Sequence, residues 1–262
     1  MASVYIAGAG GRVGRAAAAQ AGAVGLDVAA SPDAAAAWLI ALPRTVVEAD
    51  LAHWTTARDV AVVDLSGAFK ARGVGSYALL ADDRRVWSGE PVGAGRLFAN
   101  PGCIAGAVIA GLAHSGLRAH VTGGVHVTAV TAGSAAKAST RGTVRTGHLW
   151  WTHPHVAEIE QALGLACASF VPVVDYGLTT GIVATISGTA SAEALALPAD
   201  AGDAIDVAQV QHTAAVRWHR RVRAHPTLGV TFTLVVALDN LVFPAANAVA
   251  VAAAWLTARG RR

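Results

Sequence analysis

The fold of this chain is decided by the stretch Val4-Tyr5-Ile6-Ala7-Gly8-Ala9-Gly10-Gly11-Arg12-Val13-Gly14-Arg15. Its first four residues are an apolar run that suits a buried strand, and an alanine-rich, helix-favouring sequence follows it. The glycines between them have the spacing G-x-G-G-x-x-G, which is a weak signal alone in a glycine-rich chain. Because this spacing directly follows the first strand, it predicts a dinucleotide-binding turn between strand and helix.

The glycines of this turn have separate expected roles. Gly8, Gly10 and Gly11 let the backbone approach a pyrophosphate, which the N–H groups and dipole at the helix start stabilise. Gly14 lets the helix pack closely on the strand. After the second predicted strand, either Asp33 contacts the adenine ribose or Ser31 contacts a 2′-phosphate. These residues do not decide whether the cofactor is NAD or NADP.

The rest of the sequence predicts an α/β protein with two domains. Short apolar runs at 26–30, 38–42 and 60–65 alternate with helical sequence around 45–57, which predicts a parallel sheet with crossover helices. From about Val121 the strand-rich runs 121–130, 181–188 and 229–238 predict a second domain with a mixed or antiparallel sheet. The last predicted helix, 245–257, returns to the first domain.

Composition excludes several classes of protein. At 262 residues the chain can bury a core without disulfides. No apolar stretch reaches the roughly 18 residues of a membrane span, and the first residues do not resemble a signal peptide, so we expect a cytoplasmic protein with no membrane segment. The net charge of +3 comes from scattered arginines, so we expect an anionic small-molecule substrate and no nucleic acid.

Cys103 is the candidate nucleophile. It follows a turn in Asn100-Pro101-Gly102-Cys103, and the next residues predict a helix, whose N-terminal dipole would favour the thiolate. A thiolate can displace phosphate from an acyl phosphate and give a thioester, which accepts a hydride more readily than a carboxylate does. The alternative is that Cys103 is a small core residue. The other cysteine, Cys167, is expected in the core.

Two histidines are candidates for acid–base catalysis. His153 and His155 directly precede a helical pattern with apolar residues at Ile159 and Leu163. An imidazole can ionise a thiol and later protonate a hemithioacetal oxygen at neutral pH. No carboxylate or thiol at ligand spacing completes a zinc site, so we expect no metal. The alternative role of the pair is helix capping or a surface position.

Six separate runs of the chain form a recognisable series. They are, in order, Gly8-Ala9-Gly10-Gly11, Ala41-Leu42-Pro43, Val63-Asp64-Leu65-Ser66-Gly67-Ala68-Phe69, Asn100-Pro101-Gly102-Cys103, His153-Pro154-His155 followed by Glu158-Ile159-Glu160-Gln161, and Asp239-Asn240-Leu241-Val242. Together they resemble the N-acetyl-γ-glutamyl-phosphate reductase family of the aspartate-semialdehyde dehydrogenase-like superfamily. The resemblance covers most of the chain.

The resemblance implies a Rossmann-type cofactor domain, residues 1–104 with 240–262, and a catalytic and dimerisation domain, residues 105–239. It implies reduction of an N-acylated amino-acid acyl phosphate to a semialdehyde by a homo-oligomer, with NADPH as donor and NADH not excluded. Cys103 would attack, His155 would act as acid–base, and His153 would assist substrate binding, with Asn100 beside the nucleophile. The implied cofactor contacts are Gly8, Gly10, Gly11, Arg12, Val13, Leu42, Pro43, Ser66 and Asn240.

The chain also departs from the family pattern. The stretch between the second and third strands is short, and the residues that usually follow the nucleophile are replaced by Ile104-Ala105-Gly106. The substrate loop is altered at 131–137, and a lysine and glycines after Asn240 are replaced at 243–247. These changes indicate an unusual N-acyl substrate, or one on an acidic carrier protein.

Three alternatives remain at the level of sequence. Trp150-Trp151 and the basic–aromatic run 217–221 either shape a modified pocket, form a surface for an acidic carrier protein, or are a solvated helix face, and the last is favoured. The whole chain could be a non-catalytic pseudo-reductase that binds a partner or ligand. The glycine turn also resembles that of dihydrodipicolinate-reductase-like enzymes, which use no thiol.

Overall fold

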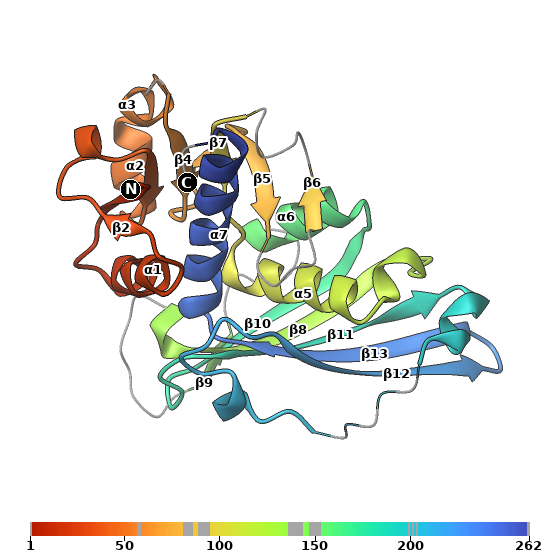
Figure 1. Ribbon diagram of the computed structural model, residues 1–262. Coiled ribbons are helices and arrows are strands. Elements are labelled where there is room, and N and C mark those ends of the chain that lie inside the picture. Colours follow the sequence, from red (N-terminus) through yellow and green to blue (C-terminus); the bar gives the residue numbers. More distant parts are fainter. Residues whose placement is uncertain are drawn as a thin grey trace. The chain divides into compact units, whose positions relative to one another are not determined.

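The computed structural model describes residues 2–56, 59–80, 86–88, 95–135, 144–146, 153–198, 200, 202 and 204–260. The chain forms two compact units, the first made of Met1–Gly102 with Leu241–Arg262 and the second of Cys103–Asn240 (Figure 1). Each unit contains one sheet.

The first unit is built on a seven-stranded sheet with the strand order β2-β1-β3-β4-β7-β5-β6. All neighbouring strands are parallel except β5 and β6. The strands are β1 Ser3–Ala7, β2 Asp27–Val28, β3 Ala37–Ile40, β4 Ala61–Asp64, β5 Ser76–Leu79, β6 Val86–Ser88 and β7 Leu97–Ala99. The helices are α1 Arg12–Ala23, α2 Arg44–Ala49, α3 Leu51–Thr56, α4 Ala68–Arg72 and α7 Val242–Ala258.

Both faces of this sheet are covered, as expected for parallel strands with apolar sequences. Leu39 of β3 packs into the core shared with α1 and α7, which lie side by side. The next residue, Ile40, packs with Phe69 of α4 on the other face. The chain leaves β1 for β2 on one side and then crosses to β3 on the other. The carboxyl ends of β1 and β3 therefore form a topological switch point, where ligands bind in such sheets.

The second unit is built on a six-stranded mixed sheet with the order β12-β13-β11-β8-β10-β9. Only β8 and β10 are parallel neighbours. The strands are β8 Val125–Ala132, β9 Val144–Thr146, β10 Cys167–Asp175, β11 Ile182–Ala190, β12 Arg217–His225 and β13 Gly229–Leu238. The helices are α5 Cys103–His114 and α6 Pro154–Leu163, with short 3-10 turns that include η3 Gly133–Ala135 and η6 Val207–Gln209.

One face of the second sheet is covered by helices. Along β8, Val125, Val127 and Ala129 are buried, while His126 and Thr128 between them are exposed. Such alternation is typical of a sheet with one face on the core and one open. The helix α5 packs against β13 and β11, and α6 packs against β10 and against α5. The α/β fold with a parallel and a mixed sheet confirms the prediction from sequence.

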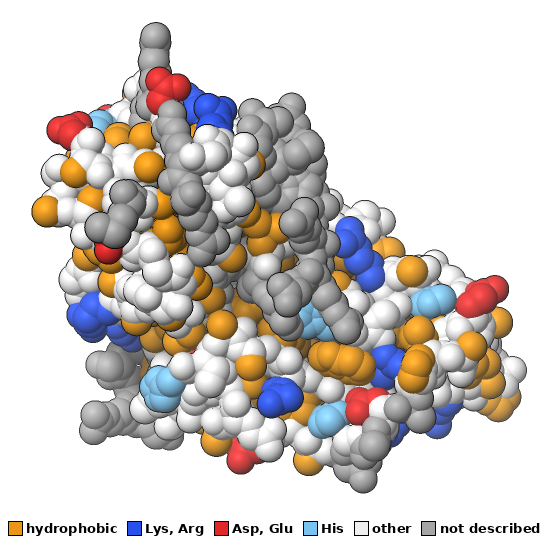
Figure 2. All heavy atoms as spheres, viewed as in Figure 1, with side chains coloured by type: hydrophobic (Ala, Val, Ile, Leu, Met, Phe, Trp, Pro, Cys, Tyr) orange, Lys and Arg blue, Asp and Glu red, His pale blue; other side chains and the backbone are white. Residues whose placement is uncertain are grey.

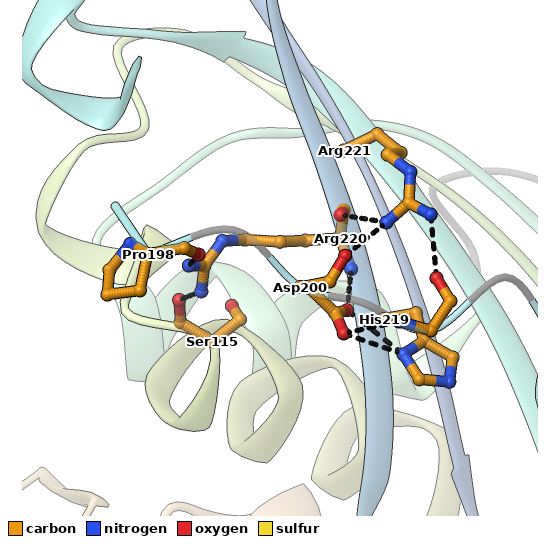
Figure 3. Close-up of polar contacts among 7 residues, drawn as sticks. Ser115, Pro198, Asp200, His219, Arg220 and Arg221 are labelled. Carbon is orange, nitrogen blue, oxygen red and sulfur yellow. Dashed lines mark hydrogen bonds and ion pairs between the residues drawn. The ribbon is translucent and has the colours of Figure 1, made fainter. Parts of the chain in front are cut away.

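The favoured interpretation of residues 217–221 as a helix face is wrong, because these residues begin strand β12. Arg221 is exposed, whereas Arg220 is buried and its guanidinium donates to the main-chain carbonyls of Ser115 and Pro198 (Figure 3). These bonds satisfy the carbonyl that follows α5 and make it possible to bury a cation. The sequence of 217–221 did not reveal the burial of Arg220, because its partners Ser115 and Pro198 are distant in sequence.

The described side chains form no large basic patch on the face drawn in Figure 2. On the face drawn in Figure 2, the basic side chains that the structure describes stand in separate small groups among polar and apolar ones. None of the helices in the described ranges is long and apolar enough to cross a bilayer.

Candidate active site

The glycine turn after β1 is tightly packed against the end of β3. Gly8 has a φ of +88°, and a Cβ there would lie 2.7 Å from the carbonyl oxygen of Ala41. A Cβ at Gly14 would lie 2.1 Å from the carbonyl oxygen of Gly8. Glycine is therefore required at both positions, at the first by conformation and contact and at the second by the close approach of α1 to β1.

The N-terminus of α1 suits a phosphate group. Gly11 is the N-cap residue and donates its N–H to the Gly8 carbonyl at 2.9 Å. Among the described residues no side chain caps α1, and its first turn carries no acidic residue. Gly10 and Arg12 are exposed and Val13 is half-buried. The free N–H groups and positive dipole end of this helix can thus hold a pyrophosphate.

The other predicted cofactor residues of the first unit lie along the same sheet edge. Leu42 and Pro43 follow β3, and Ser66 follows β4, its neighbour in the sheet. The Ser66 hydroxyl donates to Asp64 Oδ1 at 2.5 Å and accepts the Ala68 N–H at 3.1 Å. The hydroxyl of Ser66 therefore shapes the turn.

Asp64 was missed by the sequence analysis as a residue with a role of its own. Its carboxylate is fully buried and accepts the N–H groups of Ser66 and Phe69, both at 2.8 Å. Gly67, with a φ of +82°, makes the turn between them possible. The buried carboxylate thus fixes the loop that begins α4.

Asn100 has a positioning role in the structure. It is buried, its Nδ2 donates to the Pro244 carbonyl at 3.1 Å, and its Oδ1 accepts from Asn247 at 2.7 Å. Asn247, in α7, also donates to Ala78 O at 2.8 Å and accepts the Leu80 N–H at 2.5 Å. The replacement at 243–247 thus supplies a buried amide that fixes the strand ends of this unit.

The predicted helix after the Pro–Gly turn is confirmed, and Cys103 is its first residue. The side chain of Cys103 is partly exposed, whereas Cys167 is buried. Burial, together with the charge of Glu160, raises the pKa of the Cys167 thiol from 9.0 to about 11. A helix N-terminus favours a thiolate, and a buried thiol near a carboxylate disfavours one. The structure therefore separates the two cysteines as the sequence analysis expected.

The contacts of α5 define where Cys103 lies in the second unit. A Cβ at Gly111 would lie 2.2 Å from a methyl carbon of Val236 in β13, so helix and strand are in close contact there. Farther along the helix, Ser115 bonds to Arg220, which pairs with Leu234. From Gly111 back to Cys103 the helix rises about 12 Å, close to the roughly 13 Å of strand from Val236 to Asn240. Cys103 thus lies level with the end of β13.

The two histidines lie at the start of α6. His153 is the N-cap residue, and its Nδ1 accepts the His155 N–H at 3.1 Å. The ring centroids of the pair are 4.6 Å apart, and the His153 ring lies 4.6 Å from that of Phe170 in β10. The proposed capping role of His153 is therefore present, and it leaves Nε2 of His153 to carry a proton. His155 is half-buried in the first turn of α6.

Both helices of the second unit begin toward the same edge of its sheet. Near the end of α6, Glu160 accepts the N–H of Cys167, the first residue of β10, while His153 contacts Phe170 farther along that strand. The helix α6 therefore runs antiparallel to β10, toward the start of β10 and of its parallel neighbour β8. The helix α5 also begins at the edge where β8 ends. The N-termini of α5 and α6 thus point toward the same edge of the sheet, and the His153 ring lies on Phe170, which pairs with Val127 of β8.

Asn240 fixes the strand ends at that edge. Its Oδ1 accepts the Gly181 N–H at 2.7 Å, and its Nδ2 donates to Ser134 Oγ at 2.9 Å. Asn240 is buried, and these bonds join the segments that follow β8 and β13 and precede β11. Of the altered substrate loop, residues 136–137 lie outside the described part of the chain, as does the tryptophan pair 150–151.

No protein-family model and no curated protein sequence matches this chain. Among solved structures, the chain is similar to aspartate semialdehyde dehydrogenase II from Vibrio cholerae, with 13% identity, a TM-score of 0.76 and 98% coverage of both chains. It is also similar to a probable aspartate-semialdehyde dehydrogenase from Pseudomonas aeruginosa, with 16% identity, a TM-score of 0.74 and coverage of 95% and 97%. At such identities the similarity establishes the architecture, and the chain therefore has the α/β fold of these dehydrogenases.

Proposed function

We propose that this protein is an NADPH-dependent reductase that converts the acyl phosphate of an N-acylated amino acid to a semialdehyde through a thioester on Cys103. The observation that carries the proposal is the position of Cys103 as the partly exposed first residue of α5, at the sheet edge toward which the histidine helix α6 also begins. The ordered sequence runs and a fold shared with semialdehyde dehydrogenases support it.

The first step forms the thioester. The Cys103 thiolate attacks the carbonyl carbon of the acyl phosphate, and the bond from that carbon to the phosphate oxygen breaks. Inorganic phosphate leaves with the electron pair of that bond. The dipole at the start of α5 stabilises the thiolate before attack, and His155 accepts the thiol proton.

The second step reduces the thioester. A bound nicotinamide cofactor would supply a hydride to the carbonyl carbon of the thioester. The protonated His155 would give its proton to the oxygen of the resulting hemithioacetal. The carbon–sulfur bond then breaks, the hydroxyl proton returns to His155, and the aldehyde leaves Cys103 as a thiolate. The helix-capping His153, whose Nε2 can donate, would bind the substrate.

The residues of the first unit fit a dinucleotide. Gly8 and Gly14 form a cradle that a Cβ would fill, and the uncapped start of α1 offers N–H groups and Arg12 to a pyrophosphate. Leu42, Pro43 and Ser66 line the same edge. NADPH is the proposed donor, and NADH is the alternative for the assay.

The proposal extends to substrate and assembly. N-acetyl-γ-glutamyl phosphate is the first substrate to test, and a related acyl phosphate on an acidic carrier protein is the second. We also propose a homo-oligomer, as is usual for soluble enzymes of this kind.

The test is the oxidation of NADPH by the purified protein with N-acetyl-γ-glutamyl phosphate, followed at the absorbance of the reduced nicotinamide. We expect turnover by the wild type and by Cys167→Ala, and none by Cys103→Ala. Turnover that survives both Cys103→Ala and thiol alkylation would indicate a thiol-free reductase. Absence of turnover with every acyl phosphate and both cofactors would indicate a pseudo-reductase.

A further inference from the structure

Thr131 is a buried hydroxyl without a partner at the edge where Cys103 lies. Its side chain is 3% exposed, and among the described residues its Oγ1 has no hydrogen-bond partner. Thr131 belongs to the face of β8 that the helices cover, together with Val127 and Ala129. Its strand partner Ile182 pairs in turn with Leu238 at the end of β13.

Thr180 is a second such hydroxyl beside it. Its side chain is 8% exposed, and its Oγ1 also has no partner among the described residues. The next residue, Gly181, accepts the Ala132 N–H at 2.9 Å, so the backbones of the two threonines lie on hydrogen-bonded neighbouring segments. Gln211 holds the Thr180 carbonyl at 2.8 Å, and Asn240 holds the Gly181 N–H at 2.7 Å.

Two unpaired buried hydroxyls at one sheet edge need an explanation, because each costs the desolvation of a polar group. Three neutral side chains, Ser134, Gln211 and Asn240, bond around them, and the nearby buried carboxylate of Asp239 accepts the His212 N–H at 2.8 Å. A hydroxyl both donates and accepts, which matches an amide with its N–H and carbonyl. A substrate carboxylate would suit this site less well, since it would add a second negative charge near the buried Asp239.

The distance between Cys103 and Thr131 also fits a role of Thr131 in substrate binding. The helix α5 packs on β13 and β11, and β8 is the next strand beyond β11. Because strands are spaced by about 5 Å, Thr131 lies roughly one or two strand steps to the side of the helix that Cys103 begins. A substrate group that lies several bonds from the carbonyl carbon attacked by Cys103 would therefore reach Thr131.

We propose that Thr131 and Thr180 bind the neutral amide of the N-acyl group of the substrate, and so select an N-acylated acyl phosphate over a simple one. This inference rests on the proposed reductase function. It adds residues that determine specificity, and no sequence pattern pointed to Thr180.

The experiment compares Thr131→Val and Thr180→Val with the wild type, using N-acetyl-γ-glutamyl phosphate and acetyl phosphate, which has no amide. We expect KM for the N-acetylated substrate to rise by about tenfold or more in each variant, because the substrate amide loses a hydrogen bond in a buried site. We expect kcat/KM for acetyl phosphate to stay unchanged. The melting temperature should stay equal or rise, because each variant removes an unpaired buried hydroxyl.

Control variants separate this role from a structural one. Thr128→Val and Thr185→Val lie on the exposed face of β8 and β11 and should leave KM unchanged. Thr131→Ser keeps a hydroxyl and should restore most of the affinity. An unchanged KM with a lowered melting temperature in the buried variants would overturn the inference while leaving the reductase function intact. Failure of the wild type to reduce either substrate would overturn both.

Discussion

At the scale of single residues, the two cysteines show how environment separates chemically identical groups. Cys103 is partly exposed at the start of a helix, and Cys167 is 2% exposed in β10 with its N–H bonded to Glu160 at 3.0 Å. The sequence alone could separate them, because a Pro–Gly turn before Cys103 predicts a helix start. The partners of Cys167 follow from the turn between α6 and β10, which sequence patterns do not define.

The first prediction concerns the pH dependence of thiol reactivity. Because burial raises the pKa of Cys167 to about 11, this thiol stays protonated at neutral pH and should not react with iodoacetamide there. We expect alkylation of Cys103 alone near neutral pH, and of Cys167 only as the pH approaches its raised value. Peptide mass mapping of the wild type and of Cys103→Ser measures this, and early alkylation of Cys167 in the folded protein would contradict it.

The raised pKa of Cys167 also makes the stability of the folded protein depend on pH. In the folded chain the Cys167 thiol holds its proton above 9.0, where the unfolded chain releases it, so its contribution is complete below pH 9 and is lost as the pH rises toward about 11. Chemical unfolding of the wild type should therefore show a steeper loss of stability over this range than unfolding of Cys167→Ala. Equal slopes of stability against pH for the two proteins would show that the Cys167 thiol has the same pKa in the folded and unfolded chain.

At the scale of elements, local sequence predicted those parts whose geometry depends on near neighbours. The strand β1, the glycine turn and α1 follow one another within a few residues, as do the Pro–Gly turn and α5. The interpretation of 217–221 as a helix face was wrong because a short run of basic and aromatic residues does not by itself distinguish helix from strand. The partners that bury Arg220 come from segments distant in sequence, and no local pattern contains them.

The second prediction concerns the packing of α1 on β1. Gly14→Ala places a Cβ 2.1 Å from the Gly8 carbonyl oxygen, so the helix must move away from the strand. We expect a loss of about 1–3 kcal/mol in the free energy of unfolding, as for other overpacked sites, together with loss of dinucleotide binding. Urea unfolding and cofactor fluorescence titration measure the two effects.

Gly22→Ala is the matched control on the same helix, because a Cβ there would meet no atom within 4 Å. This substitution should stabilise the protein by about 0.5–1 kcal/mol through helix propensity. Equal effects of the two substitutions would show that the close approach of α1 to the turn is unimportant.

At the scale of the whole molecule, the sequence could predict the fold class and the order of the candidate groups. The α/β class followed from alternating strands and helices and is confirmed by the two sheets. The roles of Asp64, Asn247 and Thr180 could not be predicted, since each depends on burial or on partners that only the folded chain brings together. Of these three residues, only Asn247 lies where the chain departs from the family pattern.

The central claim is that Cys103 becomes acylated with release of phosphate before any hydride transfer. The most direct measurement mixes the protein with N-acetyl-γ-glutamyl phosphate in the absence of a nicotinamide cofactor and follows phosphate release and intact mass. The account predicts a phosphate burst stoichiometric with the chain, an acyl group on the peptide that contains Cys103, and its removal as aldehyde when NADPH is added. No burst, or an acyl group on any other residue, would contradict it.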